Sequence, residues 1–442
     1  MVWRLAAAVE NDVRVLLLGA TGLIGSAVAA RLARDGHELV GVTRELDSTA
    51  RRVPVARWIV LDLRDIGGPQ DWAPHLAGIE AVVNCAGTLQ DSVRDSTAKV
   101  HDTAPAALWS ACAQAGVRRV IHFSAMGVDR GALTGFSRTK QAGDAALEAS
   151  GLEWVILRPS VVVGRQAYGG SALFRGLAAL PFAVPVADTG PLDIVQLDDV
   201  AETAARLLEP GAASRVALEL AGPERLSFDQ VVAAYRAWLG WRPARTLRLP
   251  GFVMGMMWRM GDLAAWFGWR PPVRSTARRE IVRGAIGDGS AWREATGIEP
   301  RSLSAALAAD PASVQERWFA RLYLLKPLAF GTFILFWIMT AIVSLGPGWT
   351  WAVNVMRASP AAPLAELTVI AGAVGDLVVA ALLLFRRTAR LGLIAAVVVT
   401  LAYVASGTLL RPDLWADPLG PMMKVWPILA LNLILLAILD ER

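Results

Sequence analysis

Four apolar stretches near the carboxyl end constrain the fold of this chain more than any other feature. A bilayer about 30 Å thick is crossed by about 20 helical residues. The stretches cover residues 327–345, 367–385, 391–410 and 425–439, and we expect Met422 and Met423 to extend the last one, with Lys424 at the interface. Buried helices of a soluble domain are the alternative, but four successive runs favour an all-α four-helix transmembrane domain over residues 326–442.

The composition agrees with a chain that is partly soluble and partly embedded in a membrane. Hydrophobic residues make up 54% and charged residues 19% of the 442 residues, whereas soluble domains hold roughly 25% charged residues. Two cysteines, Cys85 and Cys112, exclude a disulfide framework, and the sequence shows no metal-site spacing of cysteine and histidine. Basic membrane flanks explain the pI near 9.6 as well as nucleic acid does. We therefore expect a lipid bilayer as partner, and neither a metal nor a nucleic acid.

The positions of lysine and arginine predict the orientation of the membrane domain, because cytoplasmic loops are enriched in both. Basic residues precede the first stretch and fill the turn between the second and third: Arg317, Arg321, Lys326, Arg386, Arg387 and Arg390. The apolar patch at residues 5–9 is too short for a signal peptide. These features predict a multi-pass protein of the inner (cytoplasmic) membrane, with the N-terminal region and the C-terminus in the cytoplasm.

Asp376 lies in the middle of the second stretch, next to Gly372, Ala373 and Gly375. A carboxylate at the centre of a bilayer is costly unless it is paired or neutral, so it is a candidate functional group. The alternative is a protonated aspartate that is hydrogen-bonded to a neighbouring helix, for example at Asn432. Both interpretations stay open at the level of sequence.

A strand, a glycine turn and a helix predict a nucleotide-binding domain near the N-terminus. An aliphatic run at 13–18 is followed by Gly19-Ala-Thr-Gly22-Leu-Ile-Gly25 and a helical pattern at 26–34. Gly19 permits a tight turn, Gly22 lets the backbone approach a pyrophosphate, and Gly25 lets the helix lie close to the strand. Further strands are expected at 39–43, 58–61, 81–84, 120–123 and 154–157, mostly separated by helices. This alternation predicts an α/β fold with a doubly wound parallel sheet.

The end of the second predicted strand bears on the choice of cofactor. A carboxylate at this position binds the ribose 2′-hydroxyl of NAD, whereas a guanidinium suits the 2′-phosphate of NADP. Thr43 and Arg44 stand there, which favours NADP. The adjacent Glu45 leaves NAD open.

Together these motifs resemble the short-chain dehydrogenase/reductase superfamily, in its atypical and extended branch. The resemblance covers about residues 12–300 and rests on the glycine turn, Asp62-Leu63, Asn84-Cys-Ala-Gly87, Ser124, Lys140 and the segment from Arg158 to Gly164. It implies that Asp62 and Leu63 border the adenine, that Ala86 and Gly87 border the ribose and phosphate, and that Lys140 holds the nicotinamide ribose. The full set of cofactor-binding residues that we expect is Gly19, Thr21, Gly22, Leu23, Ile24, Gly25, Arg44, Asp62, Leu63, Cys85, Ala86, Gly87, Lys140, Pro159 and Val161.

One departure from the family concerns the catalytic acid. Active members carry a tyrosine four residues before the lysine, and this chain has Phe136 there. A benzyl ring cannot transfer a proton, so conventional carbonyl reduction is not expected. Ser124 and Lys140 stay as catalytic candidates, while Ser137 and Tyr168 are alternative acids away from the family spacing. His101 stands where the extended branch often has asparagine.

Residues 12–225 are thus expected to form the Rossmann domain, and residues 226–325 a substrate lobe with a membrane-surface segment. A helix over 227–239 is predicted to be capped by Ser227. Residues 241–283 contain nine arginines but only two acidic residues, and the arginines are interspersed with tryptophan, phenylalanine and methionine. This composition is typical of a helix on a bilayer surface. The core of the substrate lobe or an apolar substrate tunnel are the alternatives.

Residues 326–442 also resemble the DoxX-like family of four-helix membrane proteins, some members of which are associated with quinone-linked redox chemistry. In outline the chain is similar to the nucleotide-binding accessory subunits of respiratory complex I. The resemblances imply a membrane-anchored NAD(P)(H)-dependent oxidoreductase acting on a lipophilic substrate, quinone-like or isoprenoid-like. The alternative is a non-catalytic NADPH-binding protein with a structural or sensing role, which assembles with a respiratory or other membrane redox protein.

Overall fold

The computed structural model describes residues 13–92, 95–130, 134–269, 271 and 273–440. The chain divides into two compact units. The first comprises Met1–Asp262 and Pro272–Ala320, and the second comprises Leu263–Pro271 and Arg321–Arg442. The patch at residues 5–9 and the C-terminal Arg442 lie outside the described residues.

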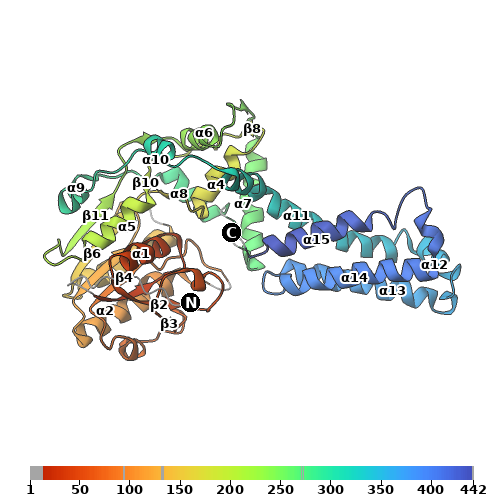
Figure 1. Ribbon diagram of the computed structural model, residues 1–442, viewed down its shortest axis with the longest axis horizontal. Coiled ribbons are helices and arrows are strands. Elements are labelled where there is room, and N and C mark those ends of the chain that lie inside the picture. Colours follow the sequence, from red (N-terminus) through yellow and green to blue (C-terminus); the bar gives the residue numbers. More distant parts are fainter. Residues whose placement is uncertain (1–12, 93–94, 131–133, 270, 272, 441–442) are drawn as a thin grey trace. The chain divides into compact units, whose positions relative to one another are not determined.

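A parallel sheet forms the centre of the first unit (Figure 1). Within the described ranges it has seven strands in the order β11-β6-β5-β4-β1-β2-β3. Their bounds are β1 Arg14–Leu18, β2 Glu38–Thr43, β3 Arg57–Val60, β4 Ala81–Asn84, β5 Arg119–Phe123, β6 Glu153–Pro159 and β11 Val216–Leu220. β1 pairs with β2 on one side and with β4 on the other, so the strand order reverses there. Ligands of such sheets bind outside the carboxyl ends of the strands at this switch point.

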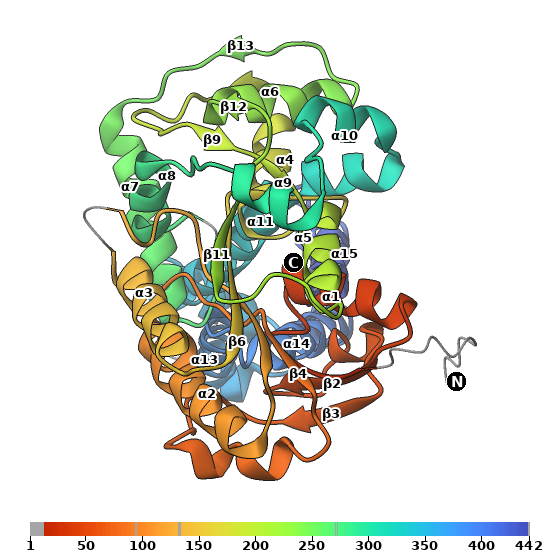
Figure 2. The same cartoon turned by 90° about the vertical axis from the view of Figure 1, so that its left-hand side faces the viewer.

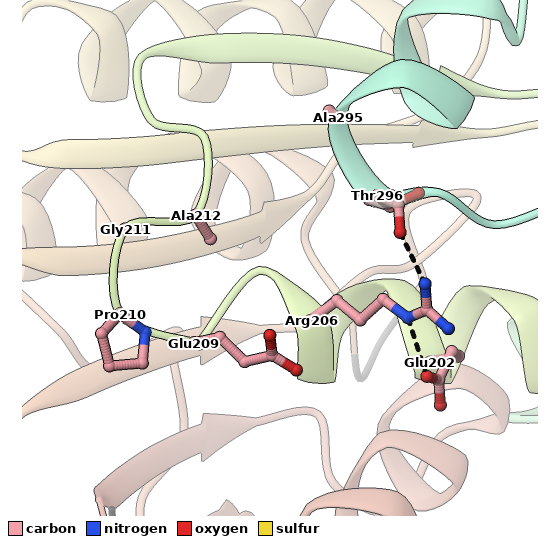
Figure 3. A pocket seen from close by; sticks show the side chains of 8 residues that line it. All are labelled: Glu202, Arg206, Glu209, Pro210, Gly211, Ala212, Ala295 and Thr296. Carbon is pink, nitrogen blue, oxygen red and sulfur yellow. Dashed lines mark hydrogen bonds and ion pairs between the residues drawn. The ribbon is translucent and has the colours of Figure 1, made fainter.

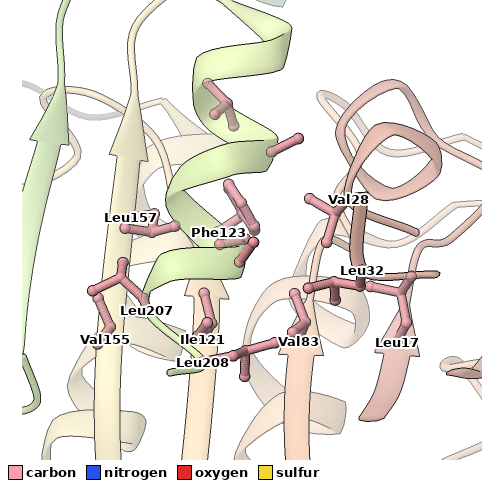
Figure 4. Close-up of a cluster of buried hydrophobic side chains, with 14 of the residues drawn as sticks. Leu17, Val28, Leu32, Val83, Ile121, Phe123, Val155, Leu157, Leu207 and Leu208 are labelled. Atoms are coloured by element: carbon pink, nitrogen blue, oxygen red, sulfur yellow. The ribbon is translucent and has the colours of Figure 1, made fainter. Parts of the chain in front are cut away.

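Alternate residues of the strands enter two separate cores, because successive side chains of a strand point to opposite faces. In β1, Val15 and Leu17 belong to one core, and Leu16 and Leu18 to the other. α1 (Leu23–Arg34) and α5 (Leu197–Arg206) cover the first core (Figure 4). α2 (Ala104–Ala115) and α3 (Gly135–Glu148) cover the second, on the opposite side of the sheet (Figure 2). The doubly wound α/β fold is therefore confirmed.

Short elements that follow β6 build a smaller lobe, and all belong to the first unit except residues 263–266 at the end of α7, which belong to the second. α4 packs on α6 through Phe174, whose ring lies 5.0 Å from that of Phe228. The Ser227 hydroxyl accepts a hydrogen bond from the backbone of Gln230 and caps α6. The elements are β7 Val162–Val163, α4 Gly169–Ala178, β8 Phe182–Ala183, β9 Leu192–Asp193, β10 Val195–Gln196, β12 Arg225–Leu226, α6 Phe228–Trp238, β13 Arg245–Thr246, α7 Gly251–Trp266, α8 Ser275–Arg283, α9 Ser290–Thr296 and α10 Leu303–Ala309.

Long apolar helices dominate the second unit, and α11 reaches it from the first. They are α11 Val314–Leu345, α13 Ala365–Leu384, α14 Ala389–Leu410 and α15 Val425–Ile438, with the shorter α12 Trp349–Arg357 between α11 and α13. Phe333 and Trp337 of α11, Leu383 of α13, Leu393 of α14 and Leu435 of α15 share one buried core. Short helical turns complete the chain: η1 Ala50–Arg52, η2 Pro69–Asp71, η3 Ala73–His75, η4 Lys99–Thr103, η5 Ala362–Leu364 and η6 Pro412–Trp415.

Among the described residues, three helical segments are long and apolar enough to cross a membrane: Val314–Leu345, Ala362–Leu384 and Ala389–Leu410. α15 has only 14 residues and spans about 21 Å at a rise of 1.5 Å per residue. Met422 and Met423 lie in a turn and do not extend it. The prediction that Met422 and Met423 extend this helix was therefore wrong, because the helix begins only at Val425, after the turn that follows Gly420.

Basic residues from separate parts of the second unit gather at one of its ends. Lys326 donates to the carbonyl of Leu439 at 3.3 Å. Arg386 pairs with Asp440 at 3.0 Å, and Arg390 contacts the same carboxylate. The start of the first span, the turn before α14 and the end of α15 therefore share one polar end. That this end faces the cytoplasm stays a prediction.

Candidate functional site

The turn between β1 and α1 has a backbone shape that a dinucleotide phosphate fits. Gly19 has φ +70°, a conformation that favours glycine, and Gly22 N donates to its carbonyl at 2.9 Å. A Cβ on Gly25 would lie 2.1 Å from the Gly19 oxygen, and one on Gly19 would lie 2.7 Å from the backbone of Cys85 and Ala86. These two glycines therefore let α1 and the loop after β4 approach β1. Burial raises the pKa of the Cys85 thiol, which stays protonated.

The first turn of α1 faces the same edge of the sheet. Its N-cap Gly22 has no side chain with which to cap the first amides, which have no acceptor inside the helix. Free amides and the positive end of the helix dipole bind phosphate groups well. The Ser26 hydroxyl donates to the Leu23 carbonyl and lies 3.3 Å from Gln166 Oε1. The partly exposed residues of this turn are Thr21, Leu23 and Ile24.

The loop after β4 lies against Lys140 of α3. Asn84 Oδ1 accepts a hydrogen bond from Ala86 N at 3.0 Å and shapes this loop. Lys140 Nζ donates to the carbonyls of Phe123 at 2.7 Å and Ala86 at 3.3 Å. A Cβ on Gly87 would lie 3.6 Å from Lys140 Nζ. Burial lowers the pKa of Lys140 to about 8, because the charged form loses its hydration. The structure thus brings together the residues expected on the nicotinamide side.

Phe136 fills the position of the usual acid with an apolar ring. Its ring packs edge-to-face on His101, with centroids 5.4 Å apart. His101 Nε2 accepts from Thr88 N at 3.0 Å, and Nδ1 lies 2.9 Å from Thr139 Oγ1. Burial lowers the pKa of His101 to about 2, so the imidazole is neutral at pH 7. Neither ring has a proton available for a substrate.

Ser124, directly after β5, donates a hydrogen bond to a buried carboxylate. Its Oγ donates to Asp144 Oδ2 at 2.8 Å, and Arg158 binds the same oxygen at 3.2 Å. His122 Nε2 lies 3.4 Å from Asp144, and its Nδ1 is hydrogen-bonded to Asn84 Nδ2 at 3.1 Å. Burial raises the pKa of Asp144, but hydrogen bonds from His122 and Ser124 outweigh it and lower the value. The Ser124 hydroxyl keeps its proton in this hydrogen bond, and its oxygen can still accept a hydrogen bond from a substrate.

Sequence reasoning missed Asp144 and His122. One signal existed for Asp144, which follows Lys140 by four residues and therefore lies on the same face of α3. His122 precedes Ser124 by two residues in β5 and points to the same side of the strand. Both side chains are buried, so they act on a substrate only through Ser124.

The two alternative acids are separated in the structure. Ser137 is buried in α3, where its hydroxyl lies 3.4 Å from Glu280 and accepts from Arg283 at 3.1 Å. Tyr168 is partly exposed as the N-cap residue of α4. Ser137 thus links α3 to α8.

Charged pairs occupy the edge where the adenine is expected. Arg44 follows β2 and pairs with Asp95 at 2.9 Å, and Asp62 follows β3 and pairs with Arg64 at 2.7 Å. Burial raises the pKa of Asp62, but the hydrogen bonds from Arg64 give a net lowering. Leu63 is buried beside them. At the end of β6, the carbonyl of Pro159 accepts from Met126 N and that of Val161 from Val195 N.

Asp376 of α13 is buried and hydrogen-bonded to α14. Tyr403 Oη donates to its carboxylate at 2.8 Å and to the carbonyl of Gly372 at 3.1 Å. Asn432 donates instead to the carbonyl of Leu393 at 3.1 Å. The suggested bond between Asp376 and Asn432 was therefore wrong. Tyr403 fills the space beside Gly372, where a Cβ would lie 3.2 Å from its hydroxyl.

A hollow of about 510 Å³ lies near the carboxyl end of α5 (Figure 3). Arg206, one of its lining residues, pairs with Glu202 at 2.9 Å and donates to the Thr296 carbonyl at 2.7 Å. α5 returns the chain to the amino ends of the strands, so this hollow lies at the edge of the sheet opposite to the glycine turn. The described residues include no cluster of three or more metal-ligating side chains.

Two protein families match this chain, one within the first unit of the structure and one within the second. Residues 19–209 match the model of the NAD(P)H-binding family, and residues 334–433 match the DoxX-like family. The described apolar helices and the DoxX-like match make this a membrane protein.

Similar curated proteins cover different lengths of the chain. Sterol demethylase protein B of Methylococcus capsulatus is 28% identical over 333 residues, which are 68% of this chain and 98% of that protein. Ceramide reductase of Caulobacter vibrioides is 24% identical over 241 residues, 53% of this chain and 73% of that protein. An uncharacterized Mycobacterium tuberculosis protein, Rv2047c, is 27% identical over 225 residues, or 50% of this chain. The present chain spans only 23% of its length.

Solved structures show the same fold. The Bordetella bronchiseptica enzyme WbmG in complex with NAD superposes with a TM-score of 0.52 at 19% identity, covering 67% of this chain and 92% of that one. A doubly wound sheet with a glycine turn at its switch point defines an NAD(P)-binding Rossmann protein, whose cofactor is a nicotinamide dinucleotide. An uncharacterized sugar epimerase of Bacillus subtilis, YhfK, is 30% identical over 153 residues, 33% of this chain and 71% of that protein. The chain belongs to the short-chain dehydrogenase/reductase superfamily and carries a C-terminal DoxX-like domain.

We predict that Gly25→Ala abolishes retention of NADPH and lowers thermal stability. The new methyl group would lie 2.1 Å from the Gly19 carbonyl oxygen, and such overpacking costs about 1–3 kcal/mol. Gly170→Ala is the matched control, because no atom lies within 4 Å of its Cβ position. Thermal unfolding and NADPH titration of the purified full-length protein measure both effects. A Gly25→Ala protein that binds NADPH like the wild type would contradict the assignment of this turn.

We predict that Asp144→Asn destabilises the first unit by about 3–5 kcal/mol. The substitution removes the buried carboxylate that pairs with Arg158, and the largely buried guanidinium then keeps its charge without this partner. Asp129→Asn removes the other partner of Arg158, but Asp129 is 38% exposed and an exposed pair is worth about 1 kcal/mol or less. Denaturant unfolding of the two variants compares these costs. Equal losses would show that the buried network does not stabilise the fold.

Proposed function

We propose that the protein is a membrane-anchored NAD(P)(H)-dependent oxidoreductase that acts on a lipophilic substrate, quinone-like or isoprenoid-like. One observation carries the proposal: the glycine turn and the buried Lys140 meet at the switch point of a sheet whose chain continues into membrane-length helices. In this division of labour, residues 12–225 bind the cofactor, 226–325 the substrate, and 326–442 anchor the chain in the inner membrane. The Rossmann domain and the C-terminus would face the cytoplasm.

The names of two relatives support a lipophilic substrate. One relative is a ceramide reductase and the other a sterol demethylase protein, and sterols and ceramides both partition into membranes. The sterol demethylase protein is matched over 98% of its length, so the similarity includes more than the glycine turn. A substrate held in the bilayer would also give the membrane anchor a purpose.

The residues at the site can bind and orient, but Phe136 cannot donate a proton. A bound nicotinamide supplies or accepts a hydride. Lys140 would hold the adjacent ribose, and the Ser124 oxygen would accept a hydrogen bond from the hydroxyl that forms on the reduced product. A quinone that receives a hydride can take its proton from water, so its reduction does not need a phenol at position 136. Because a ketone needs the missing acid and a quinone does not, the site favours a quinone-like acceptor over a simple ketone.

For the cofactor we propose NADP, with Arg44 on its 2′-phosphate. The side chain follows β2 directly and is partly exposed, and a phosphate would compete with its present partner Asp95. NAD is the alternative, since Glu45 adjoins Arg44. A redox protein of the membrane is a further proposed partner.

Phe136→Tyr tests the reaction. We expect the wild-type protein to oxidise NADPH with a short-chain quinone, and the variant to gain reduction of apolar ketones by about 100-fold, the usual contribution of a general acid. Phe136→Leu, which adds no proton donor, is the control and should gain nothing. NADPH consumption at 340 nm measures all three proteins. If NADPH stays bound through gel filtration but no quinone oxidises it, a role as an enzyme is excluded and the structural or sensing role is supported instead.

Arg44→Ala tests the cofactor. We expect the dissociation constant for NADPH to rise about tenfold or more, because a hydrogen bond to a charged group is worth about 1.5–3 kcal/mol, while that for NADH stays unchanged. Arg52→Ala, in the nearby turn η1, is the control. Equal weakening for both nucleotides would contradict the preference for NADP. Fluorescence titration of purified protein measures the constants.

A further inference from the structure

One face of α7 is apolar and exposed along its whole length. Phe252 and Trp266, near its two ends, are 76% and 79% exposed. With Met256, Met260 and Leu263 they recur every three or four residues, so all five lie on one side of the helix. We call this set the α7 stripe. Contiguous exposed apolar surface of this kind marks an interaction site, whereas single exposed side chains are ordinary.

The opposite side of α7 is packed against the protein. Trp258 and Ala265 are buried on that side. A Cβ on Gly261 would lie 1.6 Å from the carbonyl of Val273, so the backbones are in direct contact there. The helix is therefore held by one side and cannot turn its stripe inward without losing this packing.

The charge around the α7 stripe is positive. Arg259 is exposed and lies three residues after Met256 and four before Leu263, within the stripe itself. Asp262 accepts hydrogen bonds from Ser275 N at 3.2 Å and Gln90 Nε2 at 3.4 Å, so its carboxylate is engaged by the first unit. Exposed arginines also lie before and after the helix: Arg242, Arg245, Arg248, Arg278 and Arg279. Apolar rings flanked by arginine suit the headgroup region of an anionic bilayer.

The residues directly after α7 are fixed to the ends of membrane helices. The Phe267 carbonyl accepts from Arg386 N at 3.0 Å, and Trp269 Nε1 donates to the Leu384 carbonyl at 2.9 Å. Phe267 also packs on Phe385 at 5.4 Å between ring centroids. These contacts lie at the polar end of α13, where a spanning helix leaves the hydrocarbon. The chain thus leaves α7 at the depth of the headgroups.

We propose that the α7 stripe is embedded in the headgroup region of the same bilayer that the apolar helices cross, with Arg259 bound to anionic phospholipid. A second copy of the chain is a poorer occupant. A two-fold contact through the stripe would bring two positive faces together and bury Arg259 without a counter-charge. The position of α7 does not depend on the reaction at the cofactor site, because none of the stripe residues belongs to that site.

Labelling from within the lipid tests this placement. The full-length protein is reconstituted in phosphatidylcholine vesicles containing phosphatidylglycerol and a phospholipid with a diazirine on its acyl chain, and modified residues are located by mass spectrometry after illumination. We expect the α7 stripe to be modified well above background, as are lipid-facing residues near the polar ends of α13 and α14. Val60 of β3 and Phe182 of β8 are matched controls, being apolar and 57% and 47% exposed. They should show only background modification.

Modification of α7 no greater than that of Val60 overturns the proposal. So does an α7 that is unmodified by lipid but becomes cross-linked to α7 of a second copy. In Arg259→Gln, labelling of the stripe should fall about fivefold in vesicles with phosphatidylglycerol, because one arginine near an anionic surface contributes about 1 kcal/mol. An unchanged dependence on phosphatidylglycerol in this variant would overturn the role of Arg259. NADPH retention should be the same in the variant and the wild type.

Discussion

The close approach of α1 to β1 is the constraint on which the cofactor edge depends. A side chain at Gly25 would meet the carbonyl oxygen of Gly19, and one at Gly19 would meet the loop after β4. Because both positions lack a Cβ, the first turn of α1 lies at the switch point with its amides uncapped by any side chain. A phosphate at this turn would be bound by the backbone itself, and the side chains around it would be left to select the nucleotide and the substrate.

At the other end of the expected cofactor site, Phe136 stands where active members of the family carry a tyrosine, so the proton-donating phenol is missing. The apolar Phe136 ring packs on His101, whose two nitrogens are already engaged, so neither of these two rings offers a proton. On the other side, the Asp144 carboxylate orients the Ser124 hydroxyl as a hydrogen-bond acceptor. Together the two sides suit a substrate that needs orientation and hydride transfer more than it needs an acid.

Water and lipid place different demands on the two parts of this chain. The first unit buries alternate side chains of its strands in two hydrophobic cores, as proteins do in water. The spanning helices instead keep large apolar side chains such as Leu391 and Val398 exposed, as lipid requires. Inside the second unit, the polar Asp376 is bonded to Tyr403 of the neighbouring helix, because no water is at hand to solvate it. α7 combines both patterns, with a packed side and a bare apolar side.

Local pattern was enough to predict most of the architecture. The six strands expected from the sequence, the glycine turn and the cap at Ser227 lie within a few residues of their expected positions, since short-range periodicity and capping determine them. The family resemblance singled out Ala86, Gly87 and Lys140, and the structure brings the three together, while their contact with a cofactor stays a prediction. The nicotinamide class of cofactor and the membrane domain were also predicted from sequence motifs and hydropathy.

Contacts between distant segments were decided only by the tertiary structure. The partners of Asp376, Ser124 and Arg44 are Tyr403, Asp144 and Asp95, which lie 20 to 51 positions away along the chain. No periodicity encodes such pairs, because they depend on how helices and loops pack against one another. The length of α15 and the exposed side of α7 are of the same kind. The sequence alone determined which segments are strands, helices and spans, since those depend on neighbours in the chain, and packing in three dimensions decided which side chains meet.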